Sequence, residues 1–164
     1  MLAGAMVFLM AALWIMFKPD SQPASTPLYQ MAEAYNTPLP PGLQQRGGAD
    51  QVEATEAIQA YANESYKKAL KLFQAKANPT KADQLYLSNC LIQLGKYGEA
   101  KTALSSITLS DNDKYKNDVN WYLAIAALGL EDKTGAQDIL KNIVQDSDNI
   151  YKSNAEKLLK ELKK

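Results

Sequence analysis

Apolar residues recur at intervals of three and four from Gln51 to the end of the chain, which is the spacing of one face of an α-helix. Ala, Leu, Lys, Glu and Gln dominate this region, and no run alternates between apolar and polar residues as a half-buried strand does. The pattern predicts helices over about 51–63, 65–77, 81–94, 97–107, 116–130, 133–146 and 149–162. We therefore expect residues 51–162 to form an all-α domain.

The start of the chain has a different pattern, an unbroken apolar run from Leu2 to Phe17. As a helix this run would be about 24 Å long, slightly shorter than a bilayer core of about 30 Å. We interpret residues 1–17 as a transmembrane anchor, with residues 2–17 in the membrane. A cleaved signal peptide and a buried core helix are the alternatives, and the lack of a basic stretch before the run argues against a signal peptide. The same lack suggests that a cytoplasmic portion precedes this sequence.

Residues 18–50 have the composition of a linker, because six of the seven prolines and three of the eight glycines fall there. One stretch within the linker, 28–35, has helical apolar spacing and begins just after Pro27; its apolar stripe is Leu28, Met31, Ala32 and Tyr35. A helix of two turns is too short to be stable alone in water. We expect the segment either to dock on the helical domain or to remain solvated linker.

Charge and residue types exclude several functions. Lys and Arg together number 18 against 18 Asp and Glu, and Arg46 is the only arginine, so the basic surface of a nucleic-acid-binding protein is missing. The chain has no His, which removes His-dependent catalysis and most zinc sites. We interpret the carboxylates on predicted outer helix faces and loop tips, Asp113 among them, as solvated charge, and Cys90 as a small buried hydrophobic residue. We expect no enzymatic activity, cofactor, metal, small-molecule substrate or nucleic acid.

The helical region repeats itself. The strings ESYKKALKLF, GKYGEAKTAL and EDKTGAQDIL share a small residue followed four positions later by a large apolar one; the pairs are Ala69 with Phe73, Ala100 with Leu104, and Ala136 with Leu140. The alignment resembles the tetratricopeptide repeat, a helix-turn-helix of about 34 residues in which small residues let helices A and B approach closely. The resemblance implies about three repeats in a right-handed superhelix, with Gly95 in one inter-helix turn and a capping helix at the C-terminus.

The resemblance also implies where a partner would bind. The A helices of such repeats line a concave groove, and the positions carried over are Ile58, Tyr61, Tyr86, Asn89, Trp121, Tyr122 and Ile125. For Trp121 and Ile125, packing against neighbouring helices is the alternative.

The order of anchor, short segment, repeats and cap is similar to that of bacterial membrane-anchored tetratricopeptide proteins with periplasmic repeats. This similarity implies a single-pass inner-membrane scaffold that holds a protein partner, a peptide or a helix, in its groove. Self-assembly through the repeats, or regulation of a cytoplasmic partner through a preceding region, are the alternative functions.

Overall fold

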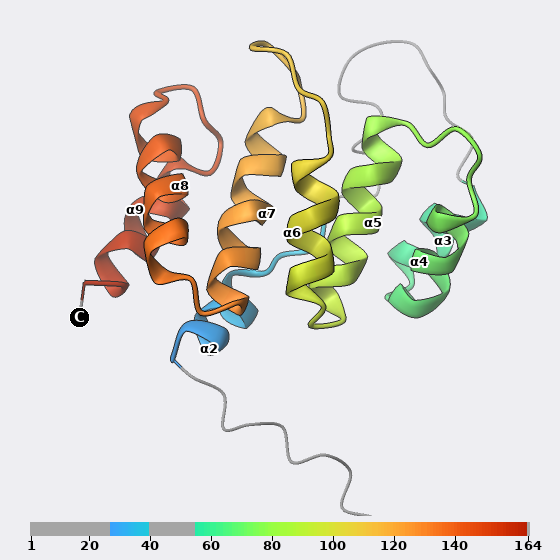
Figure 1. The fold of residues 1–164 in the computed structure, drawn as a ribbon, viewed down its shortest axis with the longest axis horizontal. Helices are drawn as coiled ribbons and strands as arrows, with labels where there is room; N and C mark the ends of the chain where they lie inside the picture. The colour runs from blue at the N-terminus through green and yellow to red at the C-terminus, as the bar shows by residue number, and fades with distance from the viewer. Residues whose placement is uncertain (1–26, 40–54, 164) are drawn as a thin grey trace, which may run out of the picture.

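The computed structural model describes residues 27–39 and 55–163, and within these two stretches it has eight α-helices and no strand (Figure 1). The helices are α2 (Pro27–Tyr35), α3 (Glu56–Ala62), α4 (Tyr66–Gln74), α5 (Lys81–Gln93), α6 (Tyr97–Ser105), α7 (Lys116–Gly129), α8 (Lys133–Gln145) and α9 (Lys152–Glu161). The apolar run Leu2–Phe17 lies outside the described residues. None of the described helices has the length and apolar content needed to cross a membrane.

Consecutive helices from α3 to α9 pack side by side, so that the chain forms the pairs α3/α4, α5/α6 and α7/α8 followed by α9 (Figure 1). The three alanines that define the repeat, Ala69, Ala100 and Ala136, are completely buried. Their small side chains let the two helices of each pair approach closely, while Phe73, Leu104 and Leu140 fill the core one turn later. The all-helical fold predicted from the apolar spacing is thus the fold of the described residues.

The turn inside each pair has the same backbone geometry. Glu64, Gly95 and Glu131 all have positive φ, of 56°, 72° and 60°. In each turn the positive-φ residue donates its N–H to the carbonyl three residues earlier, and the next residue donates to the carbonyl five residues before it; at Gly95 these distances are 2.9 and 2.8 Å. This arrangement ends a helix with a left-handed residue. Only the middle repeat has glycine there, the residue that adopts positive φ without steric cost.

Two helices begin later than their apolar spacing predicts. In the described residues α3 begins at Glu56, where the Thr55 side chain accepts a hydrogen bond from the Ile58 N–H and caps the helix. The last helix begins at Lys152 and not at 149. The Asn149 side chain accepts a hydrogen bond from the Tyr151 N–H at 2.9 Å, which holds that stretch as a turn.

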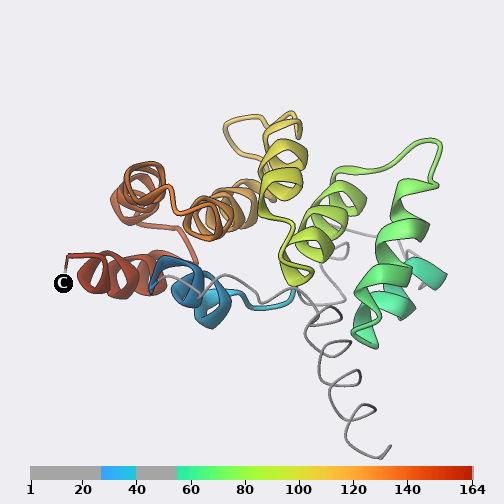
Figure 2. The ribbon, with the colours of Figure 1, turned by 60° about the horizontal axis from the view of Figure 1, so that its bottom comes forward.

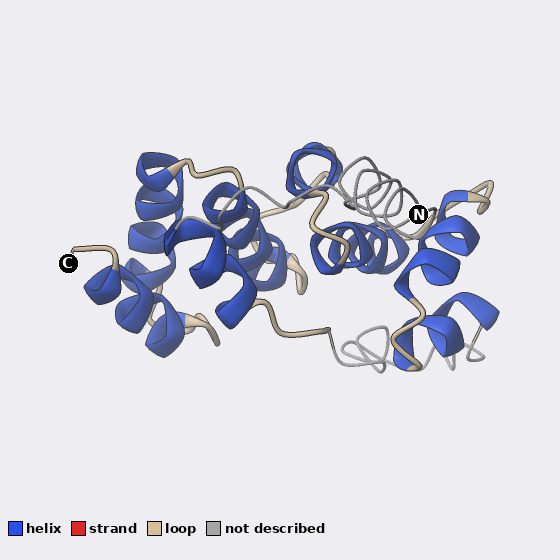
Figure 3. Cartoon of the chain, turned by 90° about the horizontal axis from the view of Figure 1, so that it is seen from below, coloured by secondary structure: helices blue, strands red, loops and turns tan. Residues whose placement is uncertain are grey.

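Helix α2 docks on the repeats. It packs against α7, on the side of the molecule where α9 also lies (Figure 2). Ala32 is fully buried, and Leu28, Met31 and Tyr35 are partly buried against the same core. Of the two alternatives for this segment, docking is the one found. Figure 3 shows α2 and the chain that follows it passing from α7 towards α3 and α5.

Several carboxylates are built into helix junctions. The interpretation of Asp113 as solvated charge is wrong, because its side chain is 8% exposed and forms an ion pair with Lys81 of the preceding repeat. Asp83 and Asp118 are buried as well. Asp118 accepts a hydrogen bond from the Tyr151 hydroxyl at 2.6 Å and thereby ties α7 to the C-terminal cap.

Candidate functional site

The candidate site is the face formed by α3, α5 and α7, the first helices of the three pairs, which we call the groove. Residues 36–39 leave α2 as an extended chain and cross this face. The Leu39 N–H donates a hydrogen bond to the Tyr61 hydroxyl of α3 at 2.7 Å. That hydroxyl in turn donates to the Asn89 Oδ1 of α5 at 2.7 Å. Burial raises the pKa of Tyr61 far above its usual range, so the hydroxyl keeps its proton and donates at any physiological pH.

Two further hydrogen bonds hold the extended chain. The Tyr122 hydroxyl of α7 donates to the Thr37 carbonyl at 2.6 Å, and the Gln93 side-chain amide of α5 donates to Asn36 Oδ1 at 3.3 Å. Two of the contacts to the extended chain, at Thr37 and Leu39, involve its backbone groups. The groove therefore binds main-chain groups of the extended chain, and it also encloses the Leu39 side chain, which is buried in the core.

An aromatic cluster anchors the end of α2. The Tyr35 ring meets Trp121 edge-on at 6.4 Å between centroids, and Trp121 stacks on Tyr151 at 5.0 Å with an angle of 3°. The Tyr35 hydroxyl donates to Glu161 Oε1 at 2.8 Å. Burial and the Glu161 carboxylate raise the pKa of Tyr35. This end of the segment thus bridges α7 and the capping helix α9.

The groove residues expected from the repeat take different positions. Four of them meet the docked segment or its hydrogen-bond network: Tyr61, Asn89, Trp121 and Tyr122. The Tyr86 ring lies between Tyr61 and Phe73, at 5.0 and 5.7 Å, in the core between the first two repeats. Ile58 and Ile125 are buried in the same core cluster.

Sequence reasoning missed two contacts of the segment, Gln93 and Glu161. Gln93 could have been predicted from the sequence, because a residue four positions after Asn89 lies on the same helix face. Glu161 has no comparable signal, since its role depends on where the cap lies in space.

The docked segment leaves two groove donors unused. Among the described residues, Asn89 Nδ2 and Trp121 Nε1 are buried and have no hydrogen-bond partner. A buried donor without a partner costs about 1–3 kcal/mol. The fit between the groove and the segment is therefore incomplete at two polar positions.

The described residues contain little that points to reaction chemistry. They include no group of three or more His, Cys, Asp or Glu side chains that could hold a metal ion. Cys90 is fully buried as expected, and burial raises the pKa of its thiol to about 12. A thiol with so high a pKa is a poor nucleophile at neutral pH, because the thiolate is the reactive form.

Comparison with known proteins agrees with this geometry. Residues 60–117 match the family model described as tetratricopeptide repeat, a stretch that runs from α3 through the whole second pair to the start of α7. No curated protein and no solved structure matches the chain. The match and the all-helical architecture of the described residues support a tetratricopeptide-repeat protein. Such repeats are generally non-enzymatic and bind protein partners, so the class supported is a protein-interaction scaffold.

Proposed function

We propose that the chain is a membrane-anchored scaffold whose groove holds an extended stretch of a partner protein, and that residues 27–39 occupy the groove until the partner displaces them. The observation that carries this proposal is the pair of buried donors without a hydrogen-bond partner among the described residues, Asn89 Nδ2 and Trp121 Nε1, on two residues that meet the docked segment or its hydrogen-bond network. A partner that offers an acceptor to either donor gains a hydrogen bond that the resident segment does not make.

The contacts of the resident segment indicate what a partner must offer. Tyr122 binds a main-chain carbonyl and Tyr61 binds a main-chain N–H, and any extended peptide presents both groups. The two unused groups are donors, so the partner supplies oxygen acceptors. Because Glu161 carries a negative charge at the cap end of this surface, neutral carbonyl oxygens suit it better than carboxylates.

The tether sets the affinity that a partner needs. Residues 40–54 join the segment to the domain in one chain, and a short covalent connection of this kind gives an effective concentration of about millimolar. A partner in trans competes against that concentration. A groove emptied of its segment therefore binds the same peptide much more tightly than the intact chain does.

A peptide-binding experiment tests the proposal. A fluorescent peptide of residues 27–39 is titrated against the full chain and against a variant that lacks these residues, both in a non-ionic detergent. We expect saturable binding to the deletion variant and at least tenfold weaker binding to the full chain, whose groove is occupied. Tyr122→Phe in the deletion background should weaken binding, while Lys141→Ala on the exposed side of α8 should not.

The decisive outcome is the behaviour of a deletion variant that remains helical by circular dichroism. If it binds no peptide, the groove is not a peptide-binding site and the proposal fails. In cells, a photo-crosslinking residue at position 89 should capture a partner more efficiently in the deletion variant than in the full chain. Equal capture by the two chains would mean that the segment does not gate the groove.

We also propose the location implied by the apolar run Leu2–Phe17: a single-pass protein of the bacterial inner membrane with periplasmic repeats. The support is the length of the run and the order of anchor, segment and repeats. Protease added to spheroplasts should digest the repeats. Full protection of the repeats after removal of the outer membrane would contradict this orientation.

A further inference from the structure

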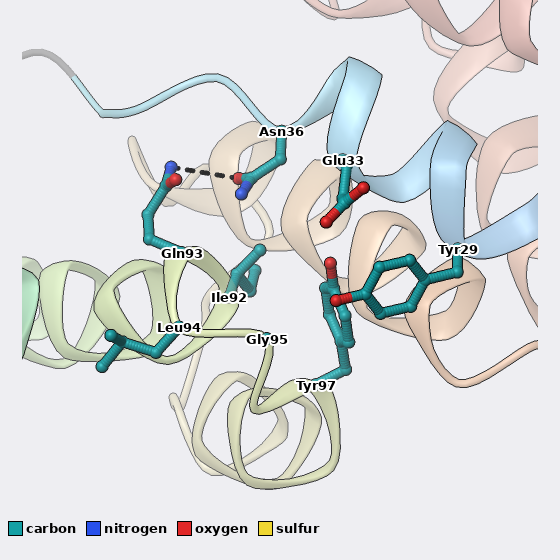
Figure 4. A pocket seen from close by; sticks show the side chains of 8 residues that line it. All are labelled: Tyr29, Glu33, Asn36, Ile92, Gln93, Leu94, Gly95 and Tyr97. Atoms are coloured by element: carbon teal, nitrogen blue, oxygen red, sulfur yellow. Dashed lines mark hydrogen bonds between the residues drawn. The ribbon is translucent and has the colours of Figure 1, made fainter. Parts of the chain in front are cut away.

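A second hollow lies beside the groove, where α2 crosses the turn between α5 and α6 (Figure 4). It has a volume of about 460 Å³. Its walls come from two separate parts of the chain: Tyr29, Glu33 and Asn36 from the docked segment, and Gln93, Gly95 and Tyr97 from the turn. The pocket therefore exists only while the segment is docked.

The pocket contains a negatively charged side chain, that of Glu33. Figure 4 shows the Glu33 carboxylate directed towards the hydroxyl groups of Tyr29 and Tyr97. No lysine of the described residues forms an ion pair with Glu33; Lys96, beside the pocket in sequence, pairs with Glu99 at 2.8 Å. Helix α5 also ends at this wall, and the C-terminal end of a helix carries a partial negative charge. The pocket is thus suited to a cation.

Two aromatic rings form the inner wall. The Tyr29 and Tyr97 rings are nearly perpendicular, at 89°, with centroids 5.6 Å apart. The Tyr97 ring also rests on Gly129 of α7, where a Cβ would lie 2.3 Å from it, so the ring is held in place from behind. Burial above all, together with Tyr29 and Glu33, raises the pKa of Tyr97 to about 12, which keeps the phenol neutral. Neutral aromatic faces attract cations.

We infer that this pocket binds the guanidinium group of an arginine side chain presented by a protein or peptide. A guanidinium is planar and donates two parallel hydrogen bonds to a carboxylate such as that of Glu33. Its face stacks on tyrosine, and its remaining N–H groups suit the side-chain oxygens of Asn36 and Gln93. A lysine ammonium has the charge but lacks the planar fork, so it fits this set of groups less well.

Arginine binding in this pocket has the opposite effect to displacement of the segment by a partner. Since Glu33 and Tyr29 belong to α2, a bound arginine stabilises the docked state of the segment and thereby keeps the groove closed. The inference depends on the docked segment and not on the proposed displacement by a partner. The two proposals therefore fail in different experiments.

The test uses the full chain in a non-ionic detergent and three amino-acid probes whose termini are blocked, so that only the side chain can carry a charge. These are N-acetyl-arginine methylamide, its citrulline counterpart, which has the same shape without the charge, and its lysine counterpart. Binding is followed by NMR through the Gly95 amide. We expect saturable binding of the arginine probe, at least tenfold tighter than the citrulline probe and tighter than the lysine probe.

Variants separate the pocket from general electrostatics. Glu33→Gln should weaken arginine binding about tenfold, while Glu99→Gln, which removes an exposed carboxylate on α6, should leave it unchanged. Saturating arginine probe should also slow hydrogen exchange at the Leu39 amide several-fold, since the docked state is stabilised. Equal binding of arginine and citrulline, full affinity in Glu33→Gln, tighter binding of lysine than arginine, or unchanged exchange at Leu39 would each overturn the inference.

Discussion

The Tyr61 hydroxyl joins the docked segment to the floor of the groove, and its removal is the sharpest test of that contact. Tyr61→Phe retains the ring and its edge-on contacts with Tyr66 and Tyr86. It removes only the oxygen that accepts from the Leu39 N–H and donates to Asn89 Oδ1, both at 2.7 Å. The change therefore isolates two hydrogen bonds from the surrounding packing.

The expected cost follows from the groups left behind. The Leu39 N–H and Asn89 Oδ1 both lose their close partner in a buried place, and each such loss costs about 1–3 kcal/mol. We expect Tyr61→Phe to lower the free energy of unfolding by about 2–6 kcal/mol if the segment stays docked. If undocking the segment costs less free energy than the two lost hydrogen bonds, the segment leaves the groove. The decrease in the free energy of unfolding then equals the free energy of docking. Tyr122→Phe, which removes the bond to the Thr37 carbonyl, should cost about half as much.

The assay combines denaturant unfolding with hydrogen exchange at the Leu39 amide. Tyr66→Phe is the matched control, since this half-buried tyrosine lies next to Tyr61 and its hydroxyl has no hydrogen bond among the described residues. The control should change stability by less than about 0.5 kcal/mol. If Tyr61→Phe is as stable as Tyr66→Phe and exchange at Leu39 is unchanged, the hydrogen-bond chain across the groove does not hold the segment.

Three further predictions concern the repeats. Gly129→Ala would put a Cβ 2.3 Å from the Tyr97 ring and should lower stability by about 1–3 kcal/mol, measured by thermal melts; an unchanged melting temperature would contradict the packing. Glu64→Gly should raise stability by about 0.5–1 kcal/mol, because Glu64 has a φ of 56°, and a loss of stability would show that its side chain matters more than its backbone. The hydrogen bond from Lys81 lowers the pKa of the Asp113 carboxyl in the folded protein. The ionised Asp113 therefore stabilises the fold above the usual aspartate pKa of about 3.9, and this stabilisation is lost as the pH falls through the lowered folded value. Asp113→Asn should therefore make stability less dependent on pH in the acid range, and an unchanged acid limb of the unfolding curve would refute this.

The repeat architecture could be predicted from the sequence because it depends on the local spacing of small and apolar residues. Ala69, Ala100 and Ala136 carry the pattern, and each is buried where two helices touch. The ends of the helices were harder to predict. The start of α9 depends on one side chain, Asn149, which bonds the backbone and delays the helix by about one turn relative to the apolar pattern.

The sequence was enough to predict which polar side chains face the groove, but not the course of the chain that lies in it. Tyr61, Asn89 and Tyr122 have hydroxyl or amide groups on A helices, and such groups need partners when they face inward. Their actual partners include backbone atoms of Thr37 and Leu39, which no side-chain pattern identifies. Asp113 was misjudged for a related reason, because its burial comes from Lys81 of another repeat.

The bond between Tyr35 and Glu161 joins residues 126 positions apart, and this separation bears on how the protein is made. Each helix pair depends on near neighbours in the chain and can form while synthesis proceeds. The docking segment is synthesised before all of the surface that receives it, yet its last contact waits for the final helix. Long-range contacts of this kind form late. A nascent chain therefore holds its segment without the Tyr35–Glu161 bond until α9 has been made, which gives a partner present at the ribosome or at the site of export an interval in which it competes with a less firmly held segment.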